Sequence, residues 1–143
     1  MVKIAKKHLL QLIKAAVKVR KNAYNPYSHY SVGASILTVS GRIYVSCNAE
    51  TVSYTGTDHA ESSTITRAIA DGEVKRSGRK FIKALVVVHE GKSGPCGLCR
   101  QRIAEHADDC LIFDVSPNGK IDKTTSLKKL LPYAFTPTHL GIK

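Results

Sequence analysis

The sequence predicts an α/β protein, a three-layer α/β/α sandwich in which helices cover both faces of a central mixed sheet. Three observations support this class. Residues 4–17 place apolar side chains at helical spacing. Residues 84–88 form a continuous apolar run, Ala-Leu-Val-Val-Val, which is typical of a strand buried on both faces. The elements follow the order helix, hairpin, helix, strand, helix, strand, which favours a sheet covered on both sides.

The first helix ends near Asn22. Its lysines lie mostly outside an apolar stripe, which consists of Ile4, Leu9, Leu12, Ile13, Ala16 and Val17. We interpret it as a core helix with a solvated basic face. A transit peptide is the alternative, but the stretch lacks the serine richness of such segments.

The hairpin follows a turn at residues 25–28, where Asn and Pro both favour a turn. Residues 32–39 are rich in β-branched and aliphatic side chains and predict a strand. Ser40-Gly41 is a short turn, residues 42–47 return as the second strand, and a polar loop continues to Asp58.

The second half alternates helices and strands. Asp58 is the expected N-cap of a helix over residues 59–70, with Gly72 just beyond its end. The remaining segments are a charged loop at 73–80, a strand at 81–88, a helix at 95–106, a strand at 110–115, a turn at 117–119 and a short helix at 126–131 that stops at Pro132.

Composition indicates one domain over residues 1–143, without a membrane-spanning segment. The four cysteines are too sparse for a disulfide scaffold, and a zinc–thiolate site fits a reducing compartment, so we expect a cytoplasmic protein.

The net charge of +11 raises the question of nucleic-acid binding. Much of that charge lies in residues 1–21, and the rest lacks clustered basic and aromatic side chains, so a nucleic-acid partner is not expected.

A catalytic zinc site is predicted by His59-Ala60-Glu61 and Pro95-Cys96-Gly97-Leu98-Cys99. His59, Cys96 and Cys99 supply three ligands, and a fourth position remains for water. Glu61 lies near that water without binding the metal. The pattern H-x-E…P-C-x-x-C is the signature of zinc deaminases that act on nucleobases.

The spacing of these residues suits converging helix N-termini. Cys96 and Cys99 share one face of a helix, and Pro95 is favourable at its start. A C-x-x-C alone is often a redox pair or half a zinc ribbon, but no second C-x-x-C is present. Cys47 and Cys110 lie in apolar, strand-like stretches and are interpreted as buried free thiols.

Several motifs make the chain resemble the cytidine deaminase family over about residues 9–140. They are Asn25-Pro26-Tyr27-Ser28-His29-Tyr30-Ser31-Val32-Gly33-Ala34, Cys47-Asn48-Ala49-Glu50-Thr51, Pro95-Cys96-Gly97-Leu98-Cys99-Arg100-Gln101 and Leu130-Leu131-Pro132-Tyr133-Ala134-Phe135. The resemblance implies one Zn²⁺ per subunit, a small nucleoside substrate, a role in pyrimidine salvage, and a homotetramer rather than a dimer.

The resemblance also implies the roles of individual residues. Asn48 and Glu50 would bind the sugar hydroxyls, and the backbone N–H of Ala60 would meet the base carbonyl. Phe135 would pack near the base from a neighbouring subunit, and Tyr54 would also reach across a subunit boundary. Without the resemblance, Asn48 and Glu50 would be interpreted as loop residues that cap local backbone.

The chain departs from the family pattern at three positions. His59 replaces a more usual cysteine, and Ser62 replaces a more usual arginine. These two changes are coherent, because two thiolates and an imidazole leave less negative charge for an arginine to offset. Tyr30 replaces an unsubstituted phenyl ring, and its hydroxyl narrows or polarises the expected pocket.

These observations predict hydrolytic deamination of cytidine or deoxycytidine, with Glu61 as the proton carrier. The nearest alternative is a deaminase of a cytosine-nucleoside analogue such as blasticidin S. A nucleic-acid-editing cytosine deaminase shares the zinc signature, but it has no need of the sugar-binding motif. A zinc-stabilised binding module is the non-enzyme alternative, and it would release no ammonia.

Overall fold

The computed structural model describes residues 3–142. Residues 1, 2 and 143 of the predicted domain lie outside it, and the first two of these belong to the basic N-terminal stretch. A five-stranded sheet has the order β2-β1-β3-β4-β5. Its strands are β1 (Gly33–Thr38), β2 (Ile43–Cys47), β3 (Ile82–Val88), β4 (Leu111–Val115) and β5 (Ile121–Ser126). The predicted mixed sheet is confirmed, because β3 and β4 run parallel and every other neighbouring pair is antiparallel.

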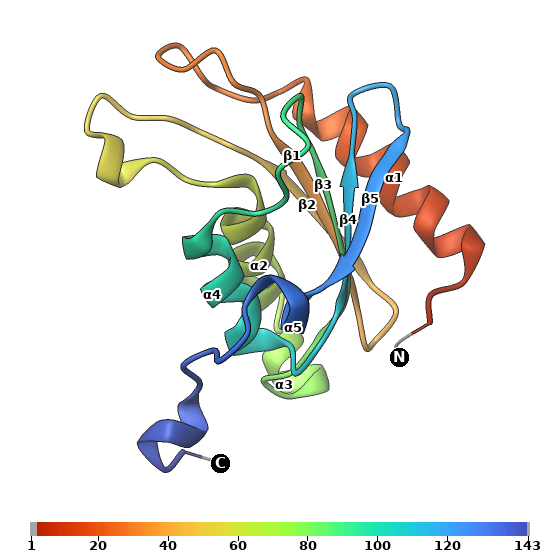
Figure 1. Ribbon diagram of the computed structural model, residues 1–143, viewed down its shortest axis with the longest axis vertical. Coiled ribbons are helices and arrows are strands. Elements are labelled where there is room, and N and C mark those ends of the chain that lie inside the picture. Colours follow the sequence, from red (N-terminus) through yellow and green to blue (C-terminus); the bar gives the residue numbers. More distant parts are fainter. Residues whose placement is uncertain (1–2, 143) are drawn as a thin grey trace.

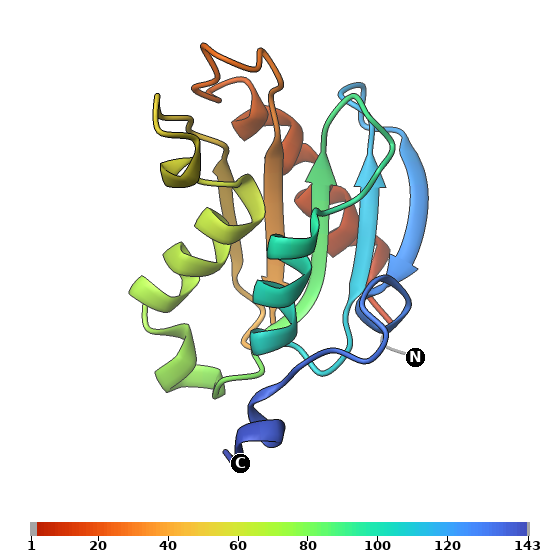
Figure 2. The same ribbon diagram turned by 60° about the vertical axis from the view of Figure 1, so that its left-hand side comes forward.

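Helices cover both faces of this sheet, as predicted (Figure 1). Helix α1 (Lys6–Arg20) lies on one face, and α2 (Ala60–Ala70), α3 (Glu73–Ser77), α4 (Gly97–His106) and α5 (Leu127–Leu130) lie on the other (Figure 2). Two short 3₁₀ turns complete the described elements, at Tyr54–Gly56 and Pro137–Leu140. Of the residues that the structure describes, none forms a helix long and apolar enough to cross a membrane.

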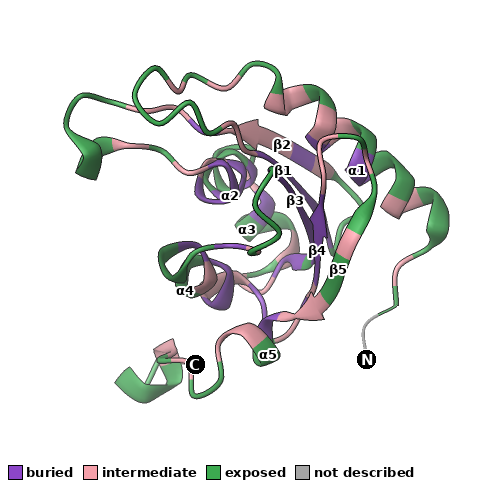
Figure 3. Cartoon of the chain, turned by 45° about the horizontal axis from the view of Figure 1, so that its top comes forward, coloured by how far each residue is buried: buried purple, intermediate pink, exposed green. Residues whose placement is uncertain are grey.

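The two faces of β3 explain its continuous apolar run. Ala84, Val86 and Val88 pack in the cluster that contains α1, whereas Leu85 and Val87 pack in the cluster that contains α2 and α4. Because successive side chains on a strand point to opposite faces, a strand covered on both sides needs apolar residues at every position. Figure 3 shows this as a buried central strand between partly exposed helices.

Two segments differ from the prediction. Residues 73–77 form helix α3 rather than part of a loop, because Gly72 turns the chain with φ 85° and Glu73 is fully buried by tertiary contacts. Strand β5 was not expected, because its residues are mostly polar and partly or fully exposed. A strand at the edge of a sheet can carry such a sequence, since one side has no neighbour to pack against.

Two local predictions are also corrected. Helix α2 begins at Ala60 with His59 at the N-cap, and no side chain caps it, so Asp58 is not the cap. Asp58 instead forms an isolated antiparallel β-bridge with Ala49. This bridge holds the end of the loop just before α2. Cys110 is buried as expected, but Cys47 is only partly buried at the end of β2.

Candidate active site

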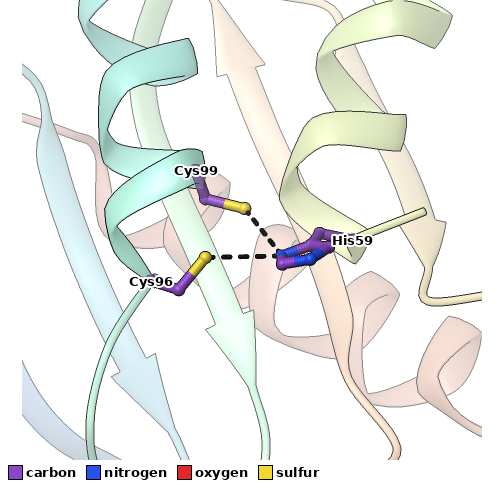
Figure 4. A group of neighbouring side chains, drawn as sticks. All are labelled: His59, Cys96 and Cys99. Atoms are coloured by element: carbon purple, nitrogen blue, oxygen red, sulfur yellow. Dashed lines mark hydrogen bonds between the residues drawn. The ribbon is translucent and has the colours of Figure 1, made fainter. Parts of the chain in front are cut away.

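Two helix starts bring the predicted metal ligands together (Figure 4). His59 is the N-cap residue of α2, and Cys96 is the N-cap residue of α4. Cys99 lies in the first turn of α4, so its side chain is on the same side as Cys96. Both N-termini carry free N–H groups and the positive end of the helix dipole, which favour thiolates and carboxylates.

The distances among the ligand atoms fit a tetrahedral zinc ion. His59 Nδ1 lies 3.4 Å from Cys96 Sγ and 3.5 Å from Cys99 Sγ. Zinc bonds of about 2.3 Å to sulfur and about 2.0 Å to nitrogen, at tetrahedral angles, place a nitrogen and a sulfur about 3.5 Å apart. Within the described residues, only these three side chains form a cluster of potential metal ligands. The donor set therefore suits Zn²⁺ with a fourth position free of protein.

The surroundings of Cys99 are also compatible with a metal ligand. Burial, followed by the charge of nearby Glu61, raises the pKa of the Cys99 thiol. A thiol in such surroundings ionises when a metal binds it, because the ion's charge outweighs the cost of burying the thiolate. Ser62 is buried too, and its Oγ lies 3.6 Å from Cys99 Sγ. The small serine thus contacts a ligand sulfur, at the position where an arginine is more usual in the family that the sequence resembles.

Glu61 lies in the first turn of α2 and is 5% exposed. Burial raises the pKa of its carboxyl, and the opposing effects of its own backbone N–H, His59 and Cys99 are smaller. A carboxyl in this state takes up a proton more readily than an exposed one. Glu61 is not part of the metal-ligand cluster, which leaves its oxygens free for proton transfer.

A pocket of about 310 Å³ opens beside the ligands, a volume at the lower end of the range for small-molecule sites. It brings together most of the predicted site residues, namely Tyr30, Asn48, Glu50, His59, Ala60, Glu61 and Cys96. Phe135 and Tyr54 do not line it, and they are 59% and 73% exposed. Within residues 3–142 of a single chain, these two aromatic rings therefore lie outside the pocket.

Asn48 and Glu50 both hold the loop before β1. The Asn48 side chain accepts from the N–H of Val32 at 2.9 Å and donates to the carbonyl of Tyr30 at 2.8 Å. Glu50 accepts a hydrogen bond from the N–H of Ser28 at 3.2 Å. Each side chain caps local backbone, yet each keeps a further hydrogen-bonding position that a ligand can use.

Sequence reasoning missed part of the pocket lining. The remaining residues are Ser28, Val32, Thr57, Val87, His89, Ser93 and Gly94. His89 had a usable signal, because it directly follows an apolar strand that pairs in parallel with its neighbour. Ligands in α/β proteins bind beyond the carboxyl ends of such strands.

Comparisons with known proteins agree with this geometry. Residues 6–114 match the family model described as the cytidine and deoxycytidylate deaminase zinc-binding region. A cytidine deaminase of Sporosarcina psychrophila is 41% identical over 134 residues, covering 92% of this chain and 93% of the relative. A blasticidin-S deaminase of Bacillus cereus is 31% identical, covering 89% of this chain and 91% of the relative.

A solved structure gives the same result for the fold. The crystal structure of a cytidine deaminase from Burkholderia pseudomallei superposes with a TM-score of 0.79 at 32% identity. The match covers 92% of this chain and 100% of the solved chain. The predicted three-layer fold is thus shared with a solved cytidine deaminase along nearly the whole chain.

Proposed function

The chain belongs to the cytidine deaminase family, and we propose that Glu61 carries the protons in its hydrolysis of cytidine and deoxycytidine. The reaction converts cytidine and water into uridine and ammonia, and zinc is the cofactor. Residues 1–143 would act as one catalytic domain. The observation that carries the proposal is the buried Glu61 beside three ligand atoms with zinc spacing, at one pocket.

The work of the chain's own residues follows from their positions. His59, Cys96 and Cys99 would hold zinc, which supplies a Lewis acid that makes water nucleophilic near neutral pH. Glu61 would accept a proton from the attacking water and deliver protons to ring N3 and to the departing amine. Its raised pKa suits both steps, because the carboxyl must gain and lose a proton in each turnover.

The substrate contacts are proposed for residues of the same pocket. The N–H of Ala60 belongs to the first residue of α2, so it has no partner within the helix and can donate to the base carbonyl. Asn48 and Glu50 would bind sugar hydroxyls with the hydrogen-bonding positions that the loop leaves free. A free base without a sugar would then bind weakly, because it leaves these polar groups unpaired.

The test is a panel of nucleosides with the zinc-loaded enzyme, followed by the change in ultraviolet absorbance and by ammonia release. Cytidine and deoxycytidine should both be deaminated, and cytosine should react far more slowly. A protein that binds zinc but releases ammonia from none of these compounds would be a binding module and not an enzyme.

A cytosine-nucleoside analogue is the second candidate substrate. The observation in its favour is the similarity to a blasticidin-S deaminase over most of both chains. Blasticidin S therefore belongs in the same panel, and a kcat/KM for it above that for cytidine would reverse the order of the two candidates.

An editing activity on nucleic acid has less support. The basic helix α1 packs on the opposite face of the sheet from α2 and α4, whose N-termini hold the site (Figure 1). Its charge therefore does not line a channel to the pocket. A single-stranded cytosine oligonucleotide, assayed at several salt concentrations beside free cytidine, should show no deamination.

We also propose a homotetramer in a reducing compartment such as the cytoplasm. Several large apolar side chains are exposed in the single chain, among them Val52 at 82%, Tyr54 at 73% and Phe135 at 59%. Assembly would bury them and could bring Phe135 and Tyr54 to a neighbouring pocket. Light scattering after size exclusion measures the mass, and a monomeric mass with full activity would contradict the assembly.

A further inference from the structure

A line of three polar side chains leads from the pocket into the core, apart from the metal ligands. The Tyr30 hydroxyl lies 2.7 Å from His89 Nδ1, and His89 Nε2 lies 2.7 Å from Asp114 Oδ1. Tyr30 and His89 line the pocket, whereas Asp114 lies on β4 behind them. His89 and Asp114 are each 3% exposed. The roles given to Glu61 and the ligands do not use these three groups.

The hydrogen bonds determine which nitrogen of His89 carries the proton. The N–H of Gly91 points to His89 Nδ1 at 3.0 Å, and an N–H can only donate. His89 Nδ1 is therefore an acceptor, and the ring proton lies on Nε2, which faces Asp114. The Tyr30 hydroxyl lies 2.7 Å from the same unprotonated Nδ1, so it donates there and shares the lone pair of that nitrogen with the N–H of Gly91. With its proton directed at His89, the Tyr30 oxygen is left to accept a hydrogen bond from the pocket.

Asp114 is what holds the imidazole in this state. The contact between His89 Nε2 and Asp114 is short but bent, and no well-directed hydrogen bond reaches either carboxylate oxygen among the described residues. A buried carboxylate with one imidazole beside it costs folding free energy. Its negative charge, 2.7 Å from Nε2, nevertheless favours a proton on that nitrogen.

We propose that Tyr30 determines substrate specificity by accepting a hydrogen bond from a sugar hydroxyl, with His89 and Asp114 as positioning residues. The inference rests on the proposed function, since it concerns the same pocket. The sugar is favoured because the carbonyl of Tyr30 is bound by Asn48, and Glu50 binds Ser28 two residues earlier. The loop that presents Tyr30 is therefore the one that both proposed sugar-binding residues hold.

Gly91 gives an independent way to displace the hydroxyl. A Cβ atom on Gly91 would lie 2.6 Å from the Tyr30 hydroxyl oxygen, which is too close for both to stay in place. Gly91 does not have a positive φ, so alanine fits its backbone. Gly91→Ala should therefore move the Tyr30 oxygen without changing the chemistry of the ring.

The experiment removes a hydroxyl group from the substrate and, separately, from the enzyme. Cytidine and its 2′-, 3′- and 5′-deoxy derivatives are assayed with the wild type, Tyr30→Phe, Gly91→Ala and the control Tyr24→Phe. Tyr24 is 60% exposed and does not line the pocket. For substrates that retain the bound hydroxyl, Tyr30→Phe should lower kcat/KM by about 3- to 10-fold, mainly through KM. The derivative that lacks that hydroxyl should lose less than about twofold.

The result that would overturn the proposal is an equal loss on all four nucleosides, or no loss on any. Gly91→Ala should reproduce the pattern of Tyr30→Phe, and Tyr24→Phe should match the wild type. Nitrogen NMR of the His89 ring should show the proton on Nε2, and a proton on Nδ1 would contradict the assigned direction of the hydrogen bond. Should the wild type deaminate no nucleoside, the proposed function fails, while calorimetric binding of the same four compounds still tests the Tyr30 contact.

Discussion

Two buried carboxyl groups lie near opposite ends of helix α2, and their pKa values are shifted in opposite directions. Glu61 in the first turn of α2 is 5% exposed, and Glu73 at the start of α3 is 0% exposed. Burial raises the pKa of Glu61. Burial also tends to raise the pKa of Glu73, but hydrogen bonds from neighbouring side chains outweigh this effect and lower the pKa of that carboxyl to about 2.

The difference lies in the number of donors. Glu73 is bound by Arg76 Nη1 at 2.6 Å and by Ser77 Oγ at 2.7 Å, and the Tyr44 hydroxyl lies 3.2 Å away. Glu61 has only its own backbone N–H and Cys99 in comparable roles. A carboxylate surrounded by donors stays ionised and fixes structure, whereas one with few donors can exchange a proton. Burial alone therefore does not identify a catalytic acid.

Of changes to the two carboxyls, the largest expected effect is the loss of catalysis at Glu61. Glu61→Gln keeps the size of the side chain but cannot carry a proton, so kcat should fall by about 10³-fold. Zinc content should stay at the wild-type level, because Glu61 is not a ligand. Ammonia release and metal analysis on the same preparation measure both quantities. Turnover near the wild-type rate would end the distinction drawn between the two carboxyls.

Removing a metal ligand tests whether the N-terminus of α2, which carries Glu61, needs a bound cation for activity and stability. Cys99→Ala should abolish zinc binding and activity and lower the unfolding temperature, because α2 and α4 no longer share a metal. Cys47→Ala is the matched control, since Cys47 is a partly buried thiol outside the ligand cluster. Full zinc occupancy in Cys99→Ala, by elemental analysis, would refute the ligand set.

The opposite result is expected at Glu73. Glu73→Gln removes the charge that Arg76 and Ser77 bind, and it should lower the free energy of unfolding by about 2 kcal/mol. Activity at neutral pH and zinc content should not change, because Glu73 does not line the pocket. Urea unfolding gives the stability, with Asp108→Asn as a control for removing an exposed acid. A Glu73→Gln protein with wild-type stability would show that the donors do not matter.

The two carboxyls also differ in how far the sequence predicts them. His59, Glu61, Cys96 and Cys99 form short motifs whose spacing carries the chemistry, so the metal cluster was predictable without a structure. Glu73 lies in a charged stretch that resembles a solvated loop. Its burial depends on Tyr44, which is 29 residues away in the sequence. No local pattern records such a contact.

The same limit applies to the pocket wall and to the edge of the sheet. His89 belongs to no recognisable motif in the sequence, and only the pairing of β3 with β4 brings it close to Asp114. Strand β5 has few apolar residues, because it is paired on one side only. The buried strands and amphipathic α1 were predictable, since core packing requires a periodic pattern there.

The smallest expected effect is the dependence of stability on acid. The folded pKa of Glu73 is about 2, below its ordinary value of 4.5. Its ionised form therefore adds stability above about pH 4.5, and that contribution is lost as the pH falls toward 2. From pH 6.5 to pH 3.5 the loss should be about 1 kcal/mol, because the solvent-exposed part of Arg76 screens the interaction. The stability difference between wild type and Glu73→Gln, measured by urea unfolding, should shrink by that amount. Zinc loss in acid affects both proteins alike, so a constant difference across this range would place the pKa of folded Glu73 near its ordinary value.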